Sequence, residues 1–351
     1  MGARSRGRST SSRRCFRRPA AAESSDRLSD RGTRLFFTGA RRPAATASRL
    51  RQPVISIGNL AMGGRAKTPL VAHLARLLLQ AGERPSILSR GYGRRRVEDG
   101  VVVVSDGRHL LADLDRSGDE PLMLARATPG AVVLVCDQRA IAGALAERHL
   151  GATVHLLDDG FQHRSLARDV DIVVVSPDDF RDRPLPFGRL REPVASLAAA
   201  DAVIVDADDA VAPPLDLPVR VPASVARFAL RRSLGEARVL EPDRPEAAAR
   251  GPVVALAGIA RPDRFFGALR DAGWQIAREV VFRDHHSYTT ADVGRLAEEV
   301  RSAAATGVVT TEKDAERLLP WRPFPVRIAA VPLEIALEPA DAFAGWLLGR
   351  L

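Results

Sequence analysis

The stretch Val54–Pro69, VISIGNLAMGGRAKTP, constrains the fold more than any other part of the chain. It begins as an apolar run with β-branched residues, which is typical of a parallel strand buried on both faces. Gly63 and Gly64 then lead into Lys67-Thr68 and an apolar helical pattern. This order predicts a phosphate-binding loop, in which backbone N–H groups face an anion, the lysine reaches the terminal phosphates and the threonine hydroxyl ligates Mg²⁺.

The loop departs from the usual pattern G-x-x-x-x-G-K-[ST], because Ala61 and Ala66 stand where that pattern has glycine. A Cβ at Ala66 crowds the tight turn, so an ordinary strand–turn–helix with a chance Lys-Thr stays open on the loop alone. The rarity of lysine favours the phosphate-binding loop over this alternative. Of the 52 basic residues 50 are arginine, and Lys67 and Lys313 are the only lysines. A compact ammonium fits between phosphates where a planar guanidinium does not.

The composition indicates a globular α/β protein. With 351 residues, 46% of them hydrophobic, the chain buries a sizeable core and is expected to form two domains. No apolar run reaches the ~18 residues of a membrane-spanning helix. Two cysteines, Cys15 and Cys136, give neither a disulfide framework nor a zinc pattern and suit a reducing compartment.

The positive charge is concentrated at the N-terminus, where residues 1–53 hold 14 arginines and three acidic residues. We expect residues 1–30 to be disordered. Contact with an anionic membrane surface, contact with nucleic acid, and a solvated tail or mis-assigned start all remain open for this segment. Leu35-Phe36-Phe37, flanked by arginines, is a better candidate for entering a lipid headgroup layer.

Strand and helix patterns alternate along the rest of the chain. They predict a P-loop NTPase-like domain at 31–206, with a mostly parallel sheet flanked by helices, followed by a Pro-rich linker at 207–222 and a smaller α/β domain at 223–351. The expected strands of the first domain are 54–57, 85–89, 101–105, 131–136, 153–157, 171–175 and 202–205, and those of the second are 253–257, 275–282 and 307–311.

A second chemical signal is the strand end Asp158-Asp159-Gly160-Phe161-Gln162-His163. An aspartate after an apolar strand, beside a phosphate loop, is where a carboxylate holds Mg²⁺ or its water shell. The alternative is an Asp-Gly turn with solvated carboxylates.

Four further segments carry polar residues with two interpretations each. Asp119 and Glu120 either act chemically or only complement a helix dipole. The arginines of 189–193 either bind a phosphate or sugar or pair with Asp182. Adjacent histidines in 284–288 are a poor metal pair but could orient a general base. The segment 310–314 is either a helix cap or a phosphate site.

Taken together, the motifs resemble one family. The order GNL-x-x-GG-x-x-KTP, SRGYG, GDEP, DDGFQH, LREP, DHH-x-Y and TTEKDA is closely similar to that of the tetraacyldisaccharide 4'-kinases, the lipid A 4'-kinases of Gram-negative bacteria. The resemblance runs from about Arg31 to the C-terminus. It implies transfer of the ATP γ-phosphate, with Mg²⁺, to the 4'-hydroxyl of a tetraacyl disaccharide 1-phosphate, by a peripheral, monomeric enzyme on the cytoplasmic face of the inner membrane.

The resemblance also implies roles for residues at matching positions. Asp119 would be the catalytic base, supported by His285 and Lys67. The nucleotide loop would comprise Ala61, Met62, Gly63, Gly64, Arg65, Ala66, Lys67 and Thr68. Mg²⁺ would be held by Thr68, Asp158 and Asp159. The substrate would be contacted by Asn59, Tyr92, Arg139, Gln162, Arg191 and Glu192.

Two other functions remain open. One is a P-loop kinase acting on a different acceptor. The other is a nucleotide- or lipid-binding protein that has lost turnover, since family loops usually have a glycine where Ala66 stands. No nucleic-acid partner is expected, because that role would rest on the Arg-rich tail alone.

Overall fold

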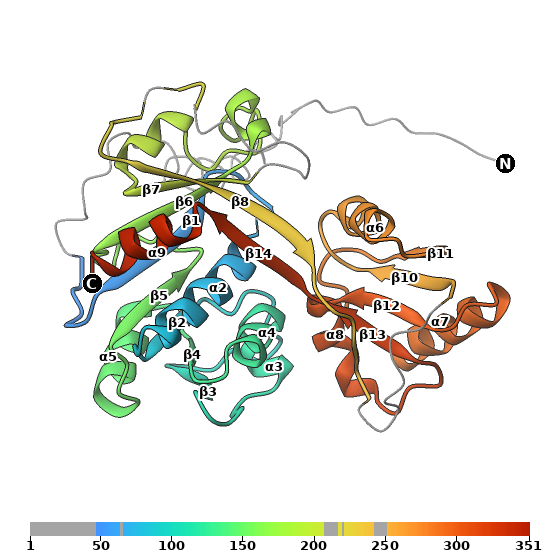
Figure 1. Ribbon diagram of the computed structural model, residues 1–351. Coiled ribbons are helices and arrows are strands. Elements are labelled where there is room, and N and C mark those ends of the chain that lie inside the picture. Colours follow the sequence, from blue (N-terminus) through green and yellow to red (C-terminus); the bar gives the residue numbers. More distant parts are fainter. Residues whose placement is uncertain (1–46, 64–65, 207–216, 220, 242–250) are drawn as a thin grey trace, which may run out of the picture. The chain divides into compact units, whose positions relative to one another are not determined.

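The computed structural model describes residues 47–351 except 64–65, 207–216, 220 and 242–250 (Figure 1). All described residues belong to one compact unit, Gly39–Leu351. The predicted disordered segment 1–30, the Leu35-Phe36-Phe37 stretch and most of the predicted linker lie outside the described residues. Among the residues that the structure describes, no helix has the length and apolarity needed to cross a bilayer.

The larger of two sheets has nine strands, and its seven inner strands are parallel. In sheet order the strands are β14 (Leu333–Glu338), β8 (Ala226–Leu234), β7 (Ala202–Asp206), β6 (Val170–Val175), β1 (Val54–Asn59), β5 (Val154–Asp158), β2 (Pro85–Ser89), β4 (Val132–Val135) and β3 (Val102–Asp106). Both edge strands, β14 and β3, are antiparallel to their neighbours. Every residue of β1 is buried, as expected for a central strand covered on both faces.

Helices cover both faces of this sheet, which confirms the predicted α/β class (Figure 1). One face carries α2 (Lys67–Gln80), α3 (Leu114–Ser117), α4 (Asp119–Ala127) and α9 (Ala340–Leu348), and the other carries α5 (Arg139–His149) with the short 3₁₀ turns η1 (Pro177–Arg181) and η2 (Val194–Ala199). Helix α2 buries Leu70, Leu74 and Leu78 against the sheet, because residues four apart lie on one helix face.

The smaller sheet has five strands, in the order β11 (Ile276–Val281), β10 (Val253–Ala257), β12 (Val308–Thr311), β13 (Ile328–Val331) and β9 (Arg238–Val239). Only β9 is antiparallel. Helix α6 (Pro262–Asp271) packs on one face and α7 (Thr290–Ser302) on the other, while α8 (Glu312–Leu318) and η3 (Leu319–Trp321) follow β12.

The strands β8 and β14 and the helix α9 lie within the predicted second domain, 223–351, yet they belong to the nine-stranded sheet. Phe343 of α9 packs edge-on against Phe228 of β8, with ring centroids 4.9 Å apart. Strand β8 carries Arg231 and Arg232, so it lacks the apolar run by which the other strands were predicted. Strand β14, LEIALE, does alternate apolar and polar residues, which is a signal for a half-buried strand that the sequence reading missed.

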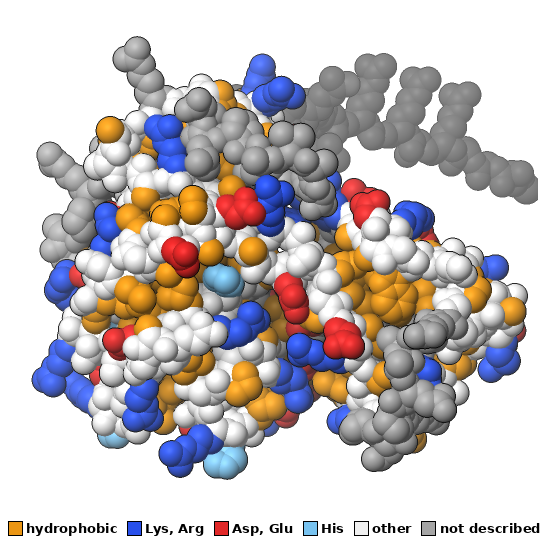
Figure 2. Space-filling model, in the orientation of Figure 1, with side chains coloured by type: hydrophobic (Ala, Val, Ile, Leu, Met, Phe, Trp, Pro, Cys, Tyr) orange, Lys and Arg blue, Asp and Glu red, His pale blue; other side chains and the backbone are white. Residues whose placement is uncertain are grey.

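On one face of the folded body, charged side chains are spread out rather than gathered in a patch (Figure 2). Figure 2 shows Lys and Arg side chains scattered over the drawn face among acidic and hydrophobic ones. This distribution agrees with the sequence, which places the basic excess in residues 1–53.

The parallel strands bring several predicted site residues to one edge of the large sheet. Ile57 of β1 pairs with Asp158 of β5, and Leu88 of β2 pairs with Leu157. The residues that follow these positions therefore emerge together at the carboxyl ends of the strands, which is where ligands bind in open α/β sheets.

Candidate active site

The phosphate loop connects β1 to α2. Ala66 precedes the helix in the left-handed conformation, with φ 51° and ψ 22°, and its methyl group is buried in the core cluster under α2. Glycine adopts this conformation freely, whereas an L-residue with a Cβ does so at a cost of about 1–2 kcal/mol. Gly63 also has a positive φ, of 101°. The predicted loop residues Gly64 and Arg65 lie outside the described part of the chain.

The start of the loop is bonded to the beginning of the LREP segment, Leu190-Arg191-Glu192-Pro193, and to the arginine before it. Ala61 is buried and forms a β-bridge with Leu190. The backbone N–H of Met62 donates to the carbonyl of Arg189 over 2.8 Å, while the Met62 side chain is 52% exposed. Loop and LREP segment therefore hold each other in position.

Lys67, the first residue of α2, is held by two partners. Its Nζ donates to Asn59 Oδ1 over 2.8 Å and forms an ion pair with Asp159 Oδ1 at 2.7 Å. Asn59 in turn donates from Nδ2 to the carbonyl oxygen of Ala61 over 2.7 Å. The lysine is thus held at the loop with its ammonium group beside the position where the motif places phosphate oxygens.

Arg191 joins the same network from the LREP segment. Its Nη1 lies 2.8 Å from Asp159 Oδ2 and 3.3 Å from Gln162 Oε1. Gln162 donates from Nε2 to the Asn59 carbonyl and to Glu192 Oε1. Six predicted site residues therefore share one network, namely Asn59, Lys67, Asp159, Gln162, Arg191 and Glu192.

The arginines of this segment divide between the two interpretations that the sequence left open. Arg189 pairs with Asp182 at 2.8 Å in an exposed loop, while Arg191 faces Asp159. Asp159 also has a positive φ, of 53°. Burial by itself raises the pKa of Asp159, but Lys67 and Arg191 outweigh it and hold the pKa at about 2.

Asp158 has a different environment. It is 6% exposed, and its side chain accepts a long hydrogen bond, 3.4 Å, from Ser89 Oγ. Burial raises the pKa of Asp158 to about 7, the charges of Glu120 and Asp159 add to the rise, and Lys67 and Arg139 oppose it. A buried carboxylate whose ionised form is so poorly compensated fits a cation.

The donor set beside the loop suits Mg²⁺, which binds through one or two carboxylates together with phosphate oxygens and water. Asp158 meets this requirement, and Thr68 is the second residue of α2, directly after Lys67. Over the described ranges, no cluster of three or more His, Cys, Asp or Glu side chains is placed to hold a metal ion.

Two buried arginines lie beyond this network. Arg139, at the start of α5, is 6% exposed, and among the described residues its hydrogen bonds are 3.5 Å contacts to the Asp137 carbonyl and to His163 Nδ1. The Arg94 side chain is 7% exposed, its Nη2 lies 3.8 Å from Asp137, and its Nη1 has no hydrogen-bond partner among the described residues. Buried guanidinium groups with such weak partners are suited to an incoming anion.

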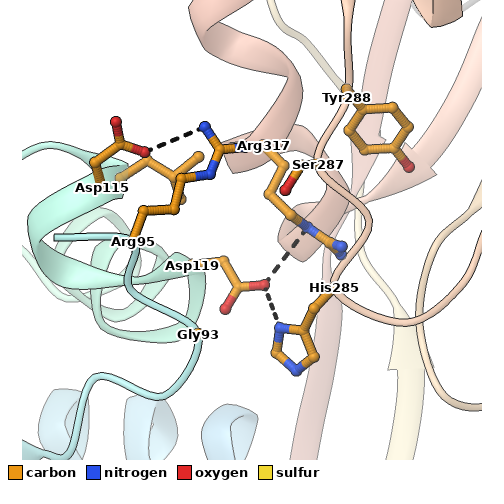
Figure 3. Close-up of a pocket in the computed structure, with 9 residues that line it drawn as sticks. Gly93, Arg95, Asp115, Asp119, His285, Ser287, Tyr288 and Arg317 are labelled. Atoms are coloured by element: carbon orange, nitrogen blue, oxygen red, sulfur yellow. Dashed lines mark hydrogen bonds and ion pairs between the residues drawn. The ribbon is translucent and has the colours of Figure 1, made fainter.

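The first turn of α4 carries the second part of the site. Asp119 is 4% exposed, and its Oδ2 lies 3.0 Å from His285 Nδ1 and 3.5 Å from Arg317 Nε (Figure 3). Its Oδ1 accepts from the backbone N–H of Glu120. Burial by itself raises the pKa of Asp119, but the His285 hydrogen bond and the charges of Lys313, His285 and Arg317 hold it below its usual value. Asp119 therefore stays ionised at neutral pH.

His285 reaches Asp119 from the loop between β11 and α7. Its φ of 56° is left-handed, and such strain in a non-glycine residue persists only where the surrounding contacts impose it. Tyr92, 71% exposed, lies edge-on to the His285 ring with centroids 5.5 Å apart. His286 points elsewhere, stacking on Phe282 and contacting Asp292, so the two adjacent histidines do not face one common ligand.

A pocket opens at this pair (Figure 3). It is lined by Gly93, Arg95, Leu114, Asp115, Asp119, His285, Ser287, Tyr288 and Arg317. The Asp119 carboxylate therefore faces a space that a ligand can enter.

Buried contacts to Asp314 of α8 fix the loop that carries His285. Asp314 is fully buried and accepts from Tyr288 Oη at 2.7 Å, Gly258 N–H at 3.0 Å and Arg317 Nη2 at 3.0 Å. It also pairs with Thr311, whose side chain caps α8. The segment 310–314 is thus a capping network, one of the two interpretations that the sequence left open.

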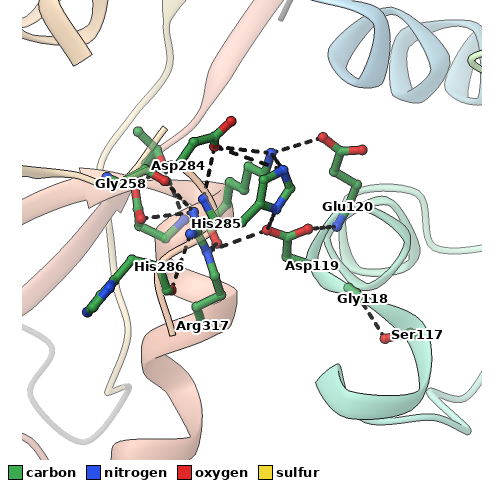
Figure 4. Close-up of polar contacts among 12 residues, drawn as sticks. Ser117, Gly118, Asp119, Glu120, Gly258, Asp284, His285, His286 and Arg317 are labelled. Carbon is green, nitrogen blue, oxygen red and sulfur yellow. Dashed lines mark hydrogen bonds and ion pairs between the residues drawn. The ribbon is translucent and has the colours of Figure 1, made fainter. Parts of the chain in front are cut away.

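Sequence reasoning singled out Glu120 but did not place Lys313 or Arg317 beside the Asp119–His285 pair (Figure 4). Lys313 Nζ lies 3.0 Å from Glu120 Oε1 and 3.1 Å from His285 Nε2, and Arg317 contacts Asp119. The signal for Lys313 was present, because it is one of two lysines in the chain. Arg317 carried no such signal, since arginine is common throughout the sequence.

Comparisons with known proteins agree on one family. The model of the family described as tetraacyldisaccharide-1-P 4'-kinase matches residues 30–351. A tetraacyldisaccharide 4'-kinase of Koribacter versatilis is 42% identical over 303 residues, covering 84% of this chain and 87% of that protein. One of Rhodopseudomonas palustris is 42% identical over 313 residues, covering 87% and 85%. The crystal structure of LpxK from Aquifex aeolicus in complex with ATP is 28% identical, with a TM-score of 0.69 and coverage of 87% and 90%.

Proposed function

Because the chain belongs to the tetraacyldisaccharide-1-phosphate 4'-kinase family, we propose that it transfers the γ-phosphate of ATP to the 4'-hydroxyl of a tetraacyl disaccharide 1-phosphate in lipid A biosynthesis. The observation that carries the proposal is the buried, ionised Asp119, hydrogen-bonded to His285 and facing a pocket. A sugar hydroxyl is a weak nucleophile, and a carboxylate in this position can accept its proton.

The nucleotide would bind at the loop between β1 and α2. The related Aquifex aeolicus structure is a complex with ATP, which supports ATP as the donor. Lys67 would exchange its contact with Asp159 for phosphate oxygens, and the backbone N–H groups at the start of α2 would face the same anion. The predicted loop residues Ala61, Met62, Gly63 and Ala66 would line this position.

Mg²⁺ would be held by Asp158, with Asp159 and Thr68 contributing through its water shell or directly. When bound, the cation supplies charge neutralisation to the transferring phosphoryl group. Lys67 and Arg191, which both pair with Asp159, would also neutralise negative charge on the transferring phosphoryl group.

The proton transfer follows from the geometry around Asp119. Its Oδ1 accepts from the Glu120 N–H, its Oδ2 lies near His285 Nδ1 and Arg317 Nε, and Asp119 is among the residues that line the pocket. Each carboxylate oxygen has two lone pairs, so the carboxylate can accept a further hydrogen bond from an acceptor hydroxyl. The oxygen of the acceptor hydroxyl forms a bond to phosphorus, the bond from phosphorus to the ADP oxygen breaks, and the hydroxyl proton passes to Asp119.

Recognition of the acceptor is assigned to polar side chains that lie outside the pocket lining itself. Tyr92 offers an exposed ring beside His285, on which a sugar face can lie. Arg139 and Arg94, which both contact Asp137, are suited to an anionic group of the substrate. Asn59, Gln162, Arg191 and Glu192 form the hydrogen-bond network that joins the phosphate loop to the LREP segment.

We place the enzyme peripherally at the cytoplasmic face of the inner membrane, acting as a monomer. Its proposed acceptor carries four acyl chains and resides in that membrane, while ATP is cytoplasmic. The arginines of residues 1–53 favour an anionic lipid surface.

The test is phosphate transfer from γ-labelled ATP to purified tetraacyl disaccharide 1-phosphate, with Mg²⁺ and detergent, using the full chain. Wild type should form labelled lipid, and Asp119→Asn should lose turnover while still binding ATP. Asp263→Asn is a matched control, because Asp263 is an exposed acidic residue in the first turn of α6. Normal transfer by Asp119→Asn would contradict the assignment of the base.

The second candidate is a binding protein without turnover, and the left-handed Ala66 is the observation that favours it. Under that alternative, wild type binds the lipid but forms no product. If Ala66→Gly then tightens ATP binding and restores transfer, the methyl group at the loop is the cause. Product from wild type rules the alternative out.

A further inference from the structure

The two lysines of this arginine-rich chain both lie in the candidate active site. Lys67 belongs to the phosphate loop, and Lys313 lies on α8 beside His285. The family motif assigns the first, but nothing described so far gives the second a role. Its contacts define one.

Lys313 determines which nitrogen of His285 carries a proton. An ammonium group has only donors, so at 3.1 Å the His285 Nε2 must be the acceptor. In a neutral imidazole the other nitrogen, Nδ1, then carries the hydrogen, and Nδ1 lies 3.0 Å from Asp119 Oδ2. The ring therefore donates to the carboxylate in the orientation that a general base requires.

Lys313 is itself held in this position. Its side chain is 18% exposed, and its Nζ lies 3.0 Å from Glu120 Oε1 and 3.9 Å from Asp284 Oδ1. Burial by itself lowers the pKa of Lys313, but the charges of Glu120, Asp119 and Asp284 outweigh it and raise the pKa above its usual value. The donor thus stays charged, and one ammonium group contacts both His285 and the neighbour of Asp119.

We propose that Lys313 is a positioning residue that holds His285 as the neutral Nδ1–H tautomer directed at Asp119. The proposal rests on the proposed kinase function for its catalytic consequence, but not for the tautomer itself. An arginine at this position would not be equivalent, because its charge is spread over a planar guanidinium. The lysine instead presents one compact ammonium group to both His285 Nε2 and Glu120.

The surroundings of His285 make Lys313 the only donor recorded at Nε2 among the described residues. Asp119 of α4, Asp284 of the same loop and Lys313 of α8 contact the ring nitrogens, and Tyr92 makes a T-shaped contact with the ring. Glu120 and Arg317 lie one contact further out, on Lys313 and Asp119. Without Lys313, the remaining charges near the ring are mostly acidic. They favour a proton on Nε2, either in the other tautomer or in the imidazolium.

The experiment combines kinetics with ¹⁵N spectra of histidine-labelled full chain, in which His285 is assigned by comparison with His285→Gln. Wild type should show a protonated Nδ1 and an unprotonated Nε2. Lys313→Met should protonate Nε2, lower kcat by roughly tenfold or more, change KM for ATP much less, and alter the pH profile of kcat. Lys313→Gln, whose amide can donate to Nε2, should keep the tautomer and part of the activity.

A matched control separates positioning from simple bracing of α4 against α8. Arg126 also joins these helices, through Glu316 at 2.9 Å, but does not contact His285. Arg126→Met should leave the His285 spectrum and kcat near wild type. An unchanged tautomer in Lys313→Met, or equal losses in Arg126→Met, would overturn the proposal. Wild type with the expected tautomer but no transfer would instead count against the kinase function alone.

Discussion

His285 Nδ1 lies 3.0 Å from Asp119 Oδ2, although 166 positions separate the two residues in the sequence. Asp119 starts a helix on the large sheet, and His285 comes from the loop after β11 in the small one. A pair assembled from such distant segments can act as a unit, because each side chain is one of the hydrogen-bond partners that orient the other.

The first prediction concerns this unit. Asp119→Asn and His285→Gln should each lower kcat by roughly 10²–10⁴-fold, and the double variant should be no slower than the slower single one, since residues acting together are not additive. Steady-state kinetics of the three variants measure this. His286→Gln is the control, because the adjacent histidine contacts Asp292 instead. Multiplying effects would show that the two residues act independently.

The second prediction concerns Lys67. Lys67→Arg should lose most transfer although it keeps the charge, because Asn59 Oδ1 and Asp159 Oδ1 hold a single ammonium group at 2.8 and 2.7 Å. ATP titration and kcat measurements together test this. Arg301→Lys is the control, because Arg301 is an exposed residue paired with Glu298. This exchange of one basic residue for the other should leave transfer unchanged. Full activity of Lys67→Arg would remove the argument from lysine usage.

The third prediction is a pH dependence at Asp158, whose pKa is raised to about 7 by burial and by Glu120 and Asp159. A raised carboxyl pKa contributes stability below the usual carboxyl range, and that contribution is lost as pH rises through about 7. The free energy of unfolding of Asp158→Asn, measured relative to wild type, should therefore be higher at about pH 8 than at about pH 5, by roughly 1–3 kcal/mol.

Urea unfolding without Mg²⁺ at both pH values measures this gain. Added Mg²⁺-ATP should reduce the gain, because the cation compensates the wild-type carboxylate. Calorimetry in two buffers should detect proton release when Mg²⁺-ATP binds at about pH 6. A stability difference that does not change with pH would contradict the raised pKa.

The fourth prediction concerns the support of the His285 loop. Tyr288→Phe removes the 2.7 Å hydrogen bond to the fully buried Asp314 and should cost about 1–3 kcal/mol in the free energy of unfolding. Because the same loop carries His285, kcat should fall as well. Thr306→Val, which removes an exposed hydroxyl bonded to a backbone carbonyl, should have little effect on either quantity. Equal stability of Tyr288→Phe and wild type would mean that Asp314 does not fix the loop.

The sequence was sufficient for much of the fold and for the parts of the site that lie close together in the chain. The strand before the glycine loop and the strand ending at Asp158 were evident from apolar runs, and parallel pairing then brings their ends together. Strand β8 was missed because Arg231 and Arg232 interrupt its apolar pattern, and β14 was missed although apolar residues alternate with glutamates in it.

Contacts between distant segments could not be derived from spacing. The pairing of Asp119 with His285 came from a family resemblance, and the contact of Arg191 with Asp159 depends on the bridge between Leu190 and Ala61. Backbone strain is also invisible in a sequence. Of the four described non-glycine residues with positive φ, three are predicted site residues, namely Ala66, Asp159 and His285.

The central claim is transfer to one particular hydroxyl, and the most direct measurement is the position of the new phosphate. The full chain is incubated with Mg²⁺-ATP and purified tetraacyl disaccharide 1-phosphate, and the lipid product is examined by ³¹P–¹H correlation. The account predicts a second phosphorus coupled to the proton at carbon 4'. Phosphate on another hydroxyl, or ADP and inorganic phosphate without phosphorylated lipid, would contradict it.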